Sequence, residues 1–129
     1  MSVLVTGGAG YIGSATVELL RSLGRDVIVL DNLVYGHREA IEADVPFYKG
    51  DVGDRELVKK IVSEHSVDAC VHFAAYAYVG ESVTDPAKYF GNNTVRTNEL
   101  LNTLIECDVK KFVFSSTCAT YGDPVRIPI

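Results

Sequence analysis

Short, nearly uninterrupted runs of apolar residues recur along this chain, and they constrain its fold more than any other feature. They lie at residues 3–5, 27–30, 45–48, 67–73 and 112–114, each bounded by turn residues. A strand covered on one face alternates apolar and polar residues, whereas a strand buried on both faces is continuously apolar. The runs therefore predict five strands of a parallel sheet that is covered by helices on both faces.

Stretches with a helical period separate these runs. Helices are predicted at residues 11–23, at residues 55–63 with Asp54 as N-cap, and at about residues 86–106. Residues 31–44 are predicted as a loop or a short broken helix over the strand ends. Strand and helix thus alternate, which predicts the α/β class.

Composition limits the size and the partners of the protein. At roughly 150 residues per domain, 129 residues form one domain. The content of 47% hydrophobic and 22% charged residues is that of a globular protein, and the net charge of −5 argues against a broad basic surface for nucleic acid or membrane. No run is long enough to span a bilayer, and residues 1–5 lack a signal-peptide start. We expect a cytoplasmic protein.

The cysteines and histidines form no metal-binding pattern. The spacings of Cys70, Cys107 and Cys118 match neither a disulfide framework nor a zinc motif, and the three histidines share no ligand spacing. We predict no metal site.

A glycine-rich turn follows the first apolar run. Gly7, Gly10 and Gly13 are spaced as GxxGxxG between a predicted strand and a predicted helix. Glycine permits a tight bend and a close approach of the backbone to a pyrophosphate, and the helix N-terminus adds unpaired N–H donors. Asp31 ends the second strand. Its separation from the glycine-rich turn is close to the roughly 20 residues expected between such a turn and a ribose-binding carboxylate. The context favours a dinucleotide site over an ordinary tight turn.

Asp31 also distinguishes between the two nicotinamide cofactors. Its carboxylate accepts hydrogen bonds from ribose hydroxyls and repels a 2′-phosphate, and residues 32–36 contain no Lys or Arg. NAD is therefore favoured over NADP. In the alternative interpretation Asp31 only starts a loop.

Further motifs extend this interpretation over nearly the whole chain. They are LDNL at 30–33, GDV at 50–52, HFAA at 72–75, VGES at 79–82, NN at 92–93 and FSST at 114–117. In the order and spacing of these motifs the chain resembles the extended short-chain dehydrogenase/reductases, and among them the nucleotide-sugar epimerases that interconvert UDP-glucose and UDP-galactose by transient oxidation at C4. The resemblance implies a Rossmann-like open sheet with the strand order 3-2-1-4-5.

The resemblance also implies which residues bind the cofactor. Beside Gly7, Gly10 and Gly13, they are Tyr11 and Ile12 against the pyrophosphate, Asp31 and Asn32 near the adenosine ribose, Asp51 and Val52 beside the adenine, Phe73, Ala74 and Ala75 along the cleft, and Asn92 near the nicotinamide. They lie at or after strand ends, where open α/β sheets bind ligands. Taken singly, Asp51 or Asn92 is more typical of a turn or a helix surface.

One residue is a catalytic candidate. In the epimerases a hydroxyl at the end of the fifth strand helps to hold the 4-hydroxyl of the sugar, and Thr117 stands at the matching position. Alternatively, Thr117 only caps the strand end. Cys118 and Ala119 follow it, where related 4,6-dehydratases carry an Asp-Glu pair. Without a carboxylic acid, elimination of water is disfavoured and epimerisation is preferred.

The Tyr-x-x-x-Lys pair of the family is absent, because none of the seven tyrosines is followed by Lys four residues later. In the family this Lys lowers the pKa of the Tyr, which then acts as a base. We therefore expect residues 1–129 to be an incomplete NAD-binding Rossmann domain without the C-terminal substrate-binding part, and to be inactive alone. A non-catalytic NAD-binding sensor or scaffold and a sugar-nucleotide dehydrogenase or reductase remain alternatives.

The expected partners follow from the same resemblance. The intact enzyme is expected to take a UDP-hexose and to form a homodimer, with the helix at 86–106 as a candidate for the interface. The strand order leaves residues 112–114 at an open edge of the sheet. An unpaired edge favours association, so we expect self-association there.

Overall fold

Five parallel strands form a single sheet in the computed structural model, which describes residues 1–128, with residues 118 and 119 described by their backbone alone. The strands are β1 (Ser2–Thr6), β2 (Asp26–Asp31), β3 (Phe47–Lys49), β4 (Val67–His72) and β5 (Lys111–Phe114). Their order is β3-β2-β1-β4-β5. The predicted Rossmann-like topology is confirmed, with β1 at the centre and β5 at one edge.

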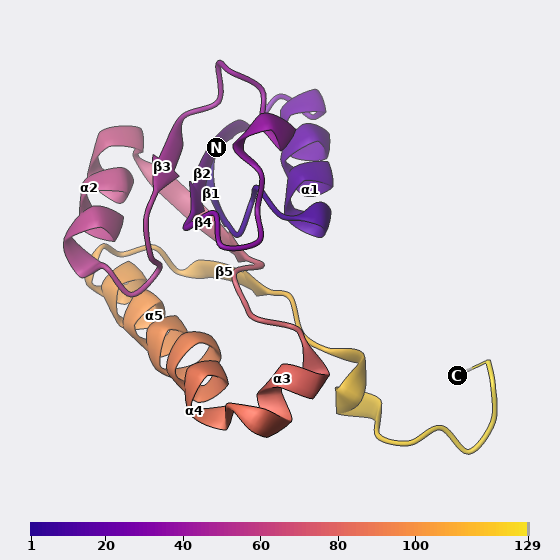
Figure 1. Ribbon diagram of the computed structural model, residues 1–129. Helices are drawn as coiled ribbons and strands as arrows, with labels where there is room; N and C mark the ends of the chain where they lie inside the picture. Colours follow the sequence, from indigo (N-terminus) through magenta and orange to yellow (C-terminus); the bar gives the residue numbers. More distant parts are fainter. Residues whose placement is uncertain (129) are drawn as a thin grey trace.

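Helices cover both faces of this sheet (Figure 1). One face is covered by α1 (Tyr11–Ser22) and the other by α2 (Arg55–His65) and α5 (Arg96–Glu106). The side chain of Asp54 accepts a hydrogen bond from the backbone N–H of Leu57, which confirms Asp54 as the N-cap of α2. None of the helices within residues 1–128 is long and apolar enough to cross a membrane.

The predicted helix at 86–106 is divided, and a helix before it was missed. The chain forms α3 (Val79–Thr84), then α4 (Pro86–Tyr89), a π-helical segment η2 (Phe90–Val95), and α5. Asp85 separates α3 from α4 and accepts a hydrogen bond from the backbone N–H of Lys88. Six residues are too few to show a helical period, so α3 was not predicted.

The loop after β2 has the predicted character, since it contains only the short 3-10 helix η1 (Arg38–Ala40). The third strand starts at Phe47 rather than at Val45. Pro46 has no N–H to donate, although its carbonyl accepts a hydrogen bond from Val29, 2.9 Å away. Val45 is buried against the α1 side of the sheet instead.

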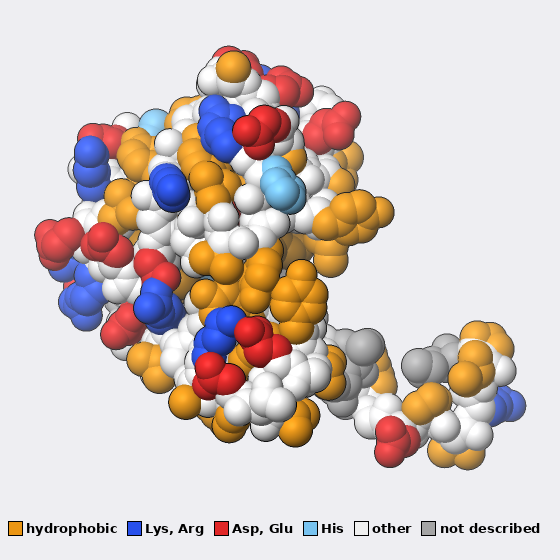
Figure 2. Space-filling view, viewed as in Figure 1, with side chains coloured by type: hydrophobic (Ala, Val, Ile, Leu, Met, Phe, Trp, Pro, Cys, Tyr) orange, Lys and Arg blue, Asp and Glu red, His pale blue; other side chains and the backbone are white. Residues whose placement is uncertain are grey.

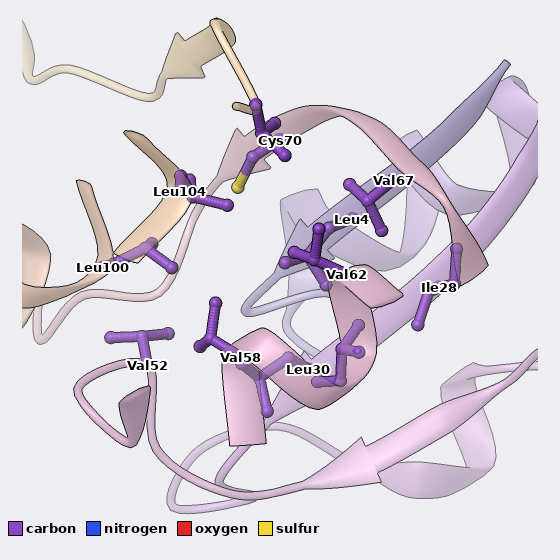
Figure 3. Close-up of a cluster of buried hydrophobic side chains, with 12 residues drawn as sticks. Leu4, Ile28, Leu30, Val52, Val58, Val62, Val67, Cys70, Leu100 and Leu104 are labelled. Atoms are coloured by element: carbon purple, nitrogen blue, oxygen red, sulfur yellow. The ribbon is translucent and has the colours of Figure 1, made fainter. Parts of the chain in front are cut away.

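Two apolar clusters hold the layers together. On the α2 and α5 side, Leu4, Ile28 and Leu30 pack with side chains from both helices (Figure 3). On the other side, Val3 and Val5 pack toward α1. Adjacent residues of β1 are therefore buried on opposite faces of the sheet, which explains the unbroken apolar sequence of this strand. Each fully buried Val or Leu contributes about 1.5–3 kcal/mol.

Cys70 belongs to the first of these clusters and is fully buried. Burial raises the pKa of its thiol to about 12, so the side chain remains a protonated, apolar packing group.

Candidate functional site

Two adjoining cavities form a cleft at the carboxyl ends of the strands. The smaller, of about 100 Å³, lies over the ends of β2 and β3, and the larger, of about 660 Å³, extends from the glycine loop to the end of β5. Gly7, Gly10 and residues 73–76 line both. Every residue predicted for cofactor or substrate lines at least one of the two cavities. The smaller cavity is lined by Asp31, Asn32, Asp51, Val52 and Asn92, and the larger cavity is lined by Tyr11, Ile12, Gly13 and Thr117.

The glycine loop has no room for side chains at two of its positions. A Cβ at Gly7, where φ is +68°, would lie 2.6 Å from the backbone nitrogen of Ala74. A Cβ at Gly13 would lie 2.2 Å from the carbonyl oxygen of Gly7. The loop therefore packs directly against the segment after β4 and against its own helix, as a backbone cradle for a phosphate requires.

The N-terminus of α1 faces this cleft without a counter-charge. Its N-cap is Gly10, which has no side chain to cap the helix, and its first turn contains no acidic residue. Tyr11 and Ile12 are 96% and 61% exposed there. Unpaired N–H donors and the positive end of the helix dipole are suited to a diphosphate.

Asp31 organises the loops on both sides of it. Only 7% of the residue is exposed. Its Oδ2 accepts a hydrogen bond from the backbone N–H of Ala9, at 3.0 Å, and its Oδ1 accepts one from Leu33, at 2.8 Å. Asp31 thus joins the glycine loop to the loop after β2 while it lines the smaller cavity, so the loop-starting interpretation describes part of its role.

Asp51 and Val52 are more strongly engaged by the protein than the sequence indicated. Oδ1 of Asp51 accepts the N–H of Gly53 at 2.9 Å, and Oδ2 forms an ion pair with Arg96 of α5. Val52 is 8% exposed and packs in the core cluster on the α2 side. Val52 consequently reaches the smaller cavity with little of its surface.

The π-helical segment turns two asparagines toward the cleft. Asn93 binds the backbone of Tyr76 twice, because its Oδ1 accepts from the N–H at 2.9 Å and its Nδ2 donates to the carbonyl at 2.8 Å. Asn92 in turn donates to Oδ1 of Asn93. Single-turn π segments are common at functional sites. The family resemblance implies a role for Asn92, whereas its neighbour Asn93 holds the cleft wall.

His72 is buried, lines the larger cavity and was not predicted from the sequence as a site residue. Its Nδ1 lies 2.6 Å from Oγ1 of Thr6 and its Nε2 lies 2.9 Å from Oγ1 of Thr97. Burial lowers the pKa of the imidazole to about 4. The neutral ring has one donor and one acceptor nitrogen, so one threonine accepts and the other donates.

Tyr89 lines the larger cavity with its phenol in the protonated form. Desolvation and the hydrogen bond to Glu81 raise the pKa of Tyr89 to about 12. Its phenol is therefore a donor at neutral pH. Among the side chains that the structure describes, no group of three His, Cys, Asp or Glu residues could hold a metal ion.

Thr117 lies just after β5, exposed at the rim of the larger cavity. Its carbonyl accepts a hydrogen bond from the N–H of Thr120, at 3.2 Å, within the 3-10 turn η3 (Cys118–Tyr121). The side chains of Cys118 and Ala119, which favoured epimerisation over dehydration, lie outside the described residues.

Known proteins resemble both the sequence and the structure. The UDP-glucose 4-epimerase of Halalkalibacterium halodurans is 57% identical over 129 residues, which cover 100% of this chain and 38% of that protein. The crystal structure of UDP-glucose 4-epimerase from Brucella ovis in complex with NAD matches 99% of this chain and 39% of that one, with a TM-score of 0.92 and 46% identity. The Bifidobacterium longum enzyme in complex with NAD⁺ and UDP matches 100% of this chain and 41% of its own, with a TM-score of 0.92 and 38% identity.

This chain thus spans about two fifths of the length of these relatives. The resemblance inferred from the motifs is confirmed. Residues 3–129 match the model of the NAD dependent epimerase/dehydratase family, whose cofactor is the one that Asp31 predicted. With this match over almost its entire length, the chain belongs to the NAD dependent epimerase/dehydratase family.

Proposed function

We propose that this chain is the NAD-binding portion of a nucleotide-sugar epimerase that interconverts UDP-glucose and UDP-galactose. The observation that carries the proposal is the continuous cleft from Asp31 to Thr117, which passes over a glycine loop with no room for side chains at Gly7 and Gly13. UDP-glucose 4-epimerases that match almost all of this chain support the choice of reaction.

The proposed roles follow the cleft from the smaller to the larger cavity. Asp31 and Asn32 would bind the adenosine ribose, and Asp51 and Val52 the adenine. Backbone N–H groups at Tyr11 and Ile12 would bind the pyrophosphate. Phe73, Ala74 and Ala75 would line the cleft up to Asn92 at the nicotinamide. When bound, NAD supplies reversible hydride transfer at C4 of the sugar.

Thr117 is the proposed contact to the 4-hydroxyl of the sugar. Its position at the rim of the larger cavity, one residue beyond the Ser115-Ser116 pair that also lines it, suits a ligand that enters beside the nicotinamide. The UDP-hexose itself would be held by the remaining length of the epimerase. The intact enzyme in this proposal is a cytoplasmic homodimer.

Titration calorimetry with NAD and NADP tests the cofactor site. The 129-residue chain is expected to bind NAD and to prefer it over NADP. Gly13→Ala would force a Cβ to within 2.2 Å of a carbonyl oxygen and is expected to weaken NAD binding at least tenfold. Gly80→Ala is the matched control, because a Cβ there meets nothing within 4 Å. Absence of NAD binding by the unaltered chain would refute the proposal.

A second experiment tests the proposal that residues 1–129 bind NAD but do not catalyse epimerisation alone. Residues 1–129 contain no Tyr-x-x-x-Lys pair, so the isolated chain is expected to bind NAD without epimerising UDP-galactose. Robust epimerase activity of the purified chain would contradict this. Stoichiometric release of NADH with sugar would instead identify a dehydrogenase.

A further inference from the structure

Three tyrosine rings meet across the cleft and form what we call the tyrosine bridge: Tyr35, Tyr76 and Tyr78. The ring centroid of Tyr35 lies 5.4 Å from that of Tyr76 and 5.0 Å from that of Tyr78, with interplanar angles of 79° and 86°. Both pairs have the edge-to-face geometry that aromatic rings prefer. Tyr35 follows β2, whereas the other two follow β4.

The strand order determines what this bridge crosses. β2 and β4 lie on opposite sides of β1, so a contact between the segments after them passes the end of β1, where the glycine loop begins. Figure 2 shows hydrophobic side chains gathered on this face between the loop after β2 and the α3–α4 segment. The bridge therefore lies beside the proposed pyrophosphate position.

The β4 end of the bridge is firmly held. Asn93 fixes the backbone of Tyr76 by two hydrogen bonds. The Tyr76 ring contacts the ring of Tyr89 at 5.8 Å between centroids, and Nζ of Lys88 lies 5.0 Å from the Tyr76 centroid. Glu81 binds both of these neighbours, accepting from Lys88 Nζ and from the Tyr89 hydroxyl at 2.7 Å each.

The β2 end is attached to the glycine loop through the carboxylate of Asp31, which accepts from Ala9 and Leu33, and through a backbone hydrogen bond. The N–H of His37 donates to the carbonyl of Ala9 at 3.0 Å. Tyr35 itself is 41% exposed, and Tyr78 is 59% exposed. Because Asn93 holds the backbone of Tyr76, Tyr35 is the ring of this pair that can move away. Tyr35 and Tyr76 both line the smaller cavity.

We propose that the tyrosine bridge is a strap over the dinucleotide, which opens at Tyr35 for entry and, when closed, slows cofactor release. The inference rests on the proposed NAD binding and adds a kinetic role for residues outside the predicted site. The rings are positioning residues, since they retain the cofactor without touching the reacting atoms. Loss of Tyr35 removes both edge-to-face contacts at once.

The rate of NADH release tests the strap. The 129-residue chain is loaded with NADH, mixed with excess NAD in a stopped-flow instrument, and followed by NADH fluorescence. Tyr35→Ala is expected to release NADH about five- to tenfold faster than the unaltered chain, from the loss of two aromatic pairs. Tyr35→Phe keeps the ring and is expected to remain within about twofold. Val34→Ala, at a neighbouring exposed residue, is the matched control.

The outcomes separate the strap from the proposed function. Unchanged release from Tyr35→Ala, with NADH bound, would overturn the strap and leave the proposed function intact. A chain that binds no NADH would overturn both. The thermal unfolding midpoint of Tyr35→Phe is expected to match that of the unaltered chain, whereas Tyr35→Ala is expected to lower it modestly, because the alanine variant loses both aromatic contacts. A lowered midpoint together with unchanged release would assign Tyr35 a purely structural role.

Discussion

Nδ1 of His72 lies 2.6 Å from Oγ1 of Thr6, although 66 residues separate them in the chain. The two side chains stand at the carboxyl ends of the neighbouring strands β4 and β1, and Thr97 of α5 binds the other nitrogen of the same ring. One neutral imidazole thus connects the central strand, its neighbour and the helix that packs on them.

The burial of His72 predicts a loss of stability in acid. Its folded pKa of about 4 lies below the ordinary value of 6.5, so between these values the unfolded chain binds the proton more readily and the free energy of unfolding falls as pH falls. From pH 7 to pH 5.5 this group alone is expected to cost about 1 kcal/mol. Urea titrations of His72→Gln should lack that part of the decrease.

His37→Gln is the control for this experiment, since His37 is exposed. The decrease assigned to His72 should persist in this variant. An identical pH dependence for His72→Gln would show that His72 is not the titrating group.

Asp31→Asn is expected to impair both stability and cofactor choice. An amide has a single acceptor oxygen, so one of the N–H groups of Ala9 and Leu33 loses its partner, at a cost of about 1–3 kcal/mol. Removal of the negative charge should also reduce the preference for NAD over NADP. Urea unfolding and calorimetry measure the two effects.

Asp26→Asn is the corresponding control at the opposite end of β2. The Asp26 side chain is 83% exposed and contacts only the N-terminal amine, at 3.9 Å, among the ion pairs of the described residues. This variant should behave like the unaltered chain. Equal stability of the Asp31 and Asp26 variants would contradict the assigned role of Asp31.

Self-association is expected to depend on the open edge at β5. Val113 and Phe114 are 61% and 55% exposed on this strand, and β5 has a neighbour on one side only in the described sheet. Charged residues block edge pairing, so Val113→Lys should lower the sedimentation coefficient observed at high concentration. Ile105→Lys, 68% exposed on α5, tests association through the helix instead. Dissociation by the Ile105 change alone would disprove association at the edge.

Two adjacent residues of α5 should differ sharply in their contribution to stability. Leu104 is 2% exposed in the core, whereas Ile105 is 68% exposed. Leu104→Ala is expected to reduce the unfolding free energy by about 2–5 kcal/mol. Ile105→Ala should change it by less than about 0.5 kcal/mol. Similar losses in the two variants, measured by urea denaturation, would mean that this helix packs differently.

The sheet could be predicted from the sequence because its strands are apolar on both faces. Leu4 packs toward α2 while Val3 and Val5 pack toward α1, and this double burial leaves an unbroken apolar run in place of the alternation of a strand covered on one face. The glycine loop could also be predicted from the sequence, because its packing excludes a Cβ at Gly13. In both cases a local physical requirement determines the residue type.

The remainder of the cleft could not be predicted because it depends on contacts between distant segments. Tyr35 and Tyr76 meet only after the sheet has brought the loops after β2 and β4 together. The neutral state of His72 likewise arises from burial, and nothing in its sequence neighbourhood indicates it. The role of Asn93 depends on the π-helical turn, which has no sequence period of its own.

The segments that follow the carboxyl ends of all five strands line one cleft. The cleft therefore exists only when the entire sheet is assembled. Ligand occupancy and global folding are therefore thermodynamically linked. A dinucleotide at a hundred times its dissociation constant would add about 2.7 kcal/mol to the free energy of unfolding. The concentration of the cofactor would then also determine how fast proteases degrade the chain.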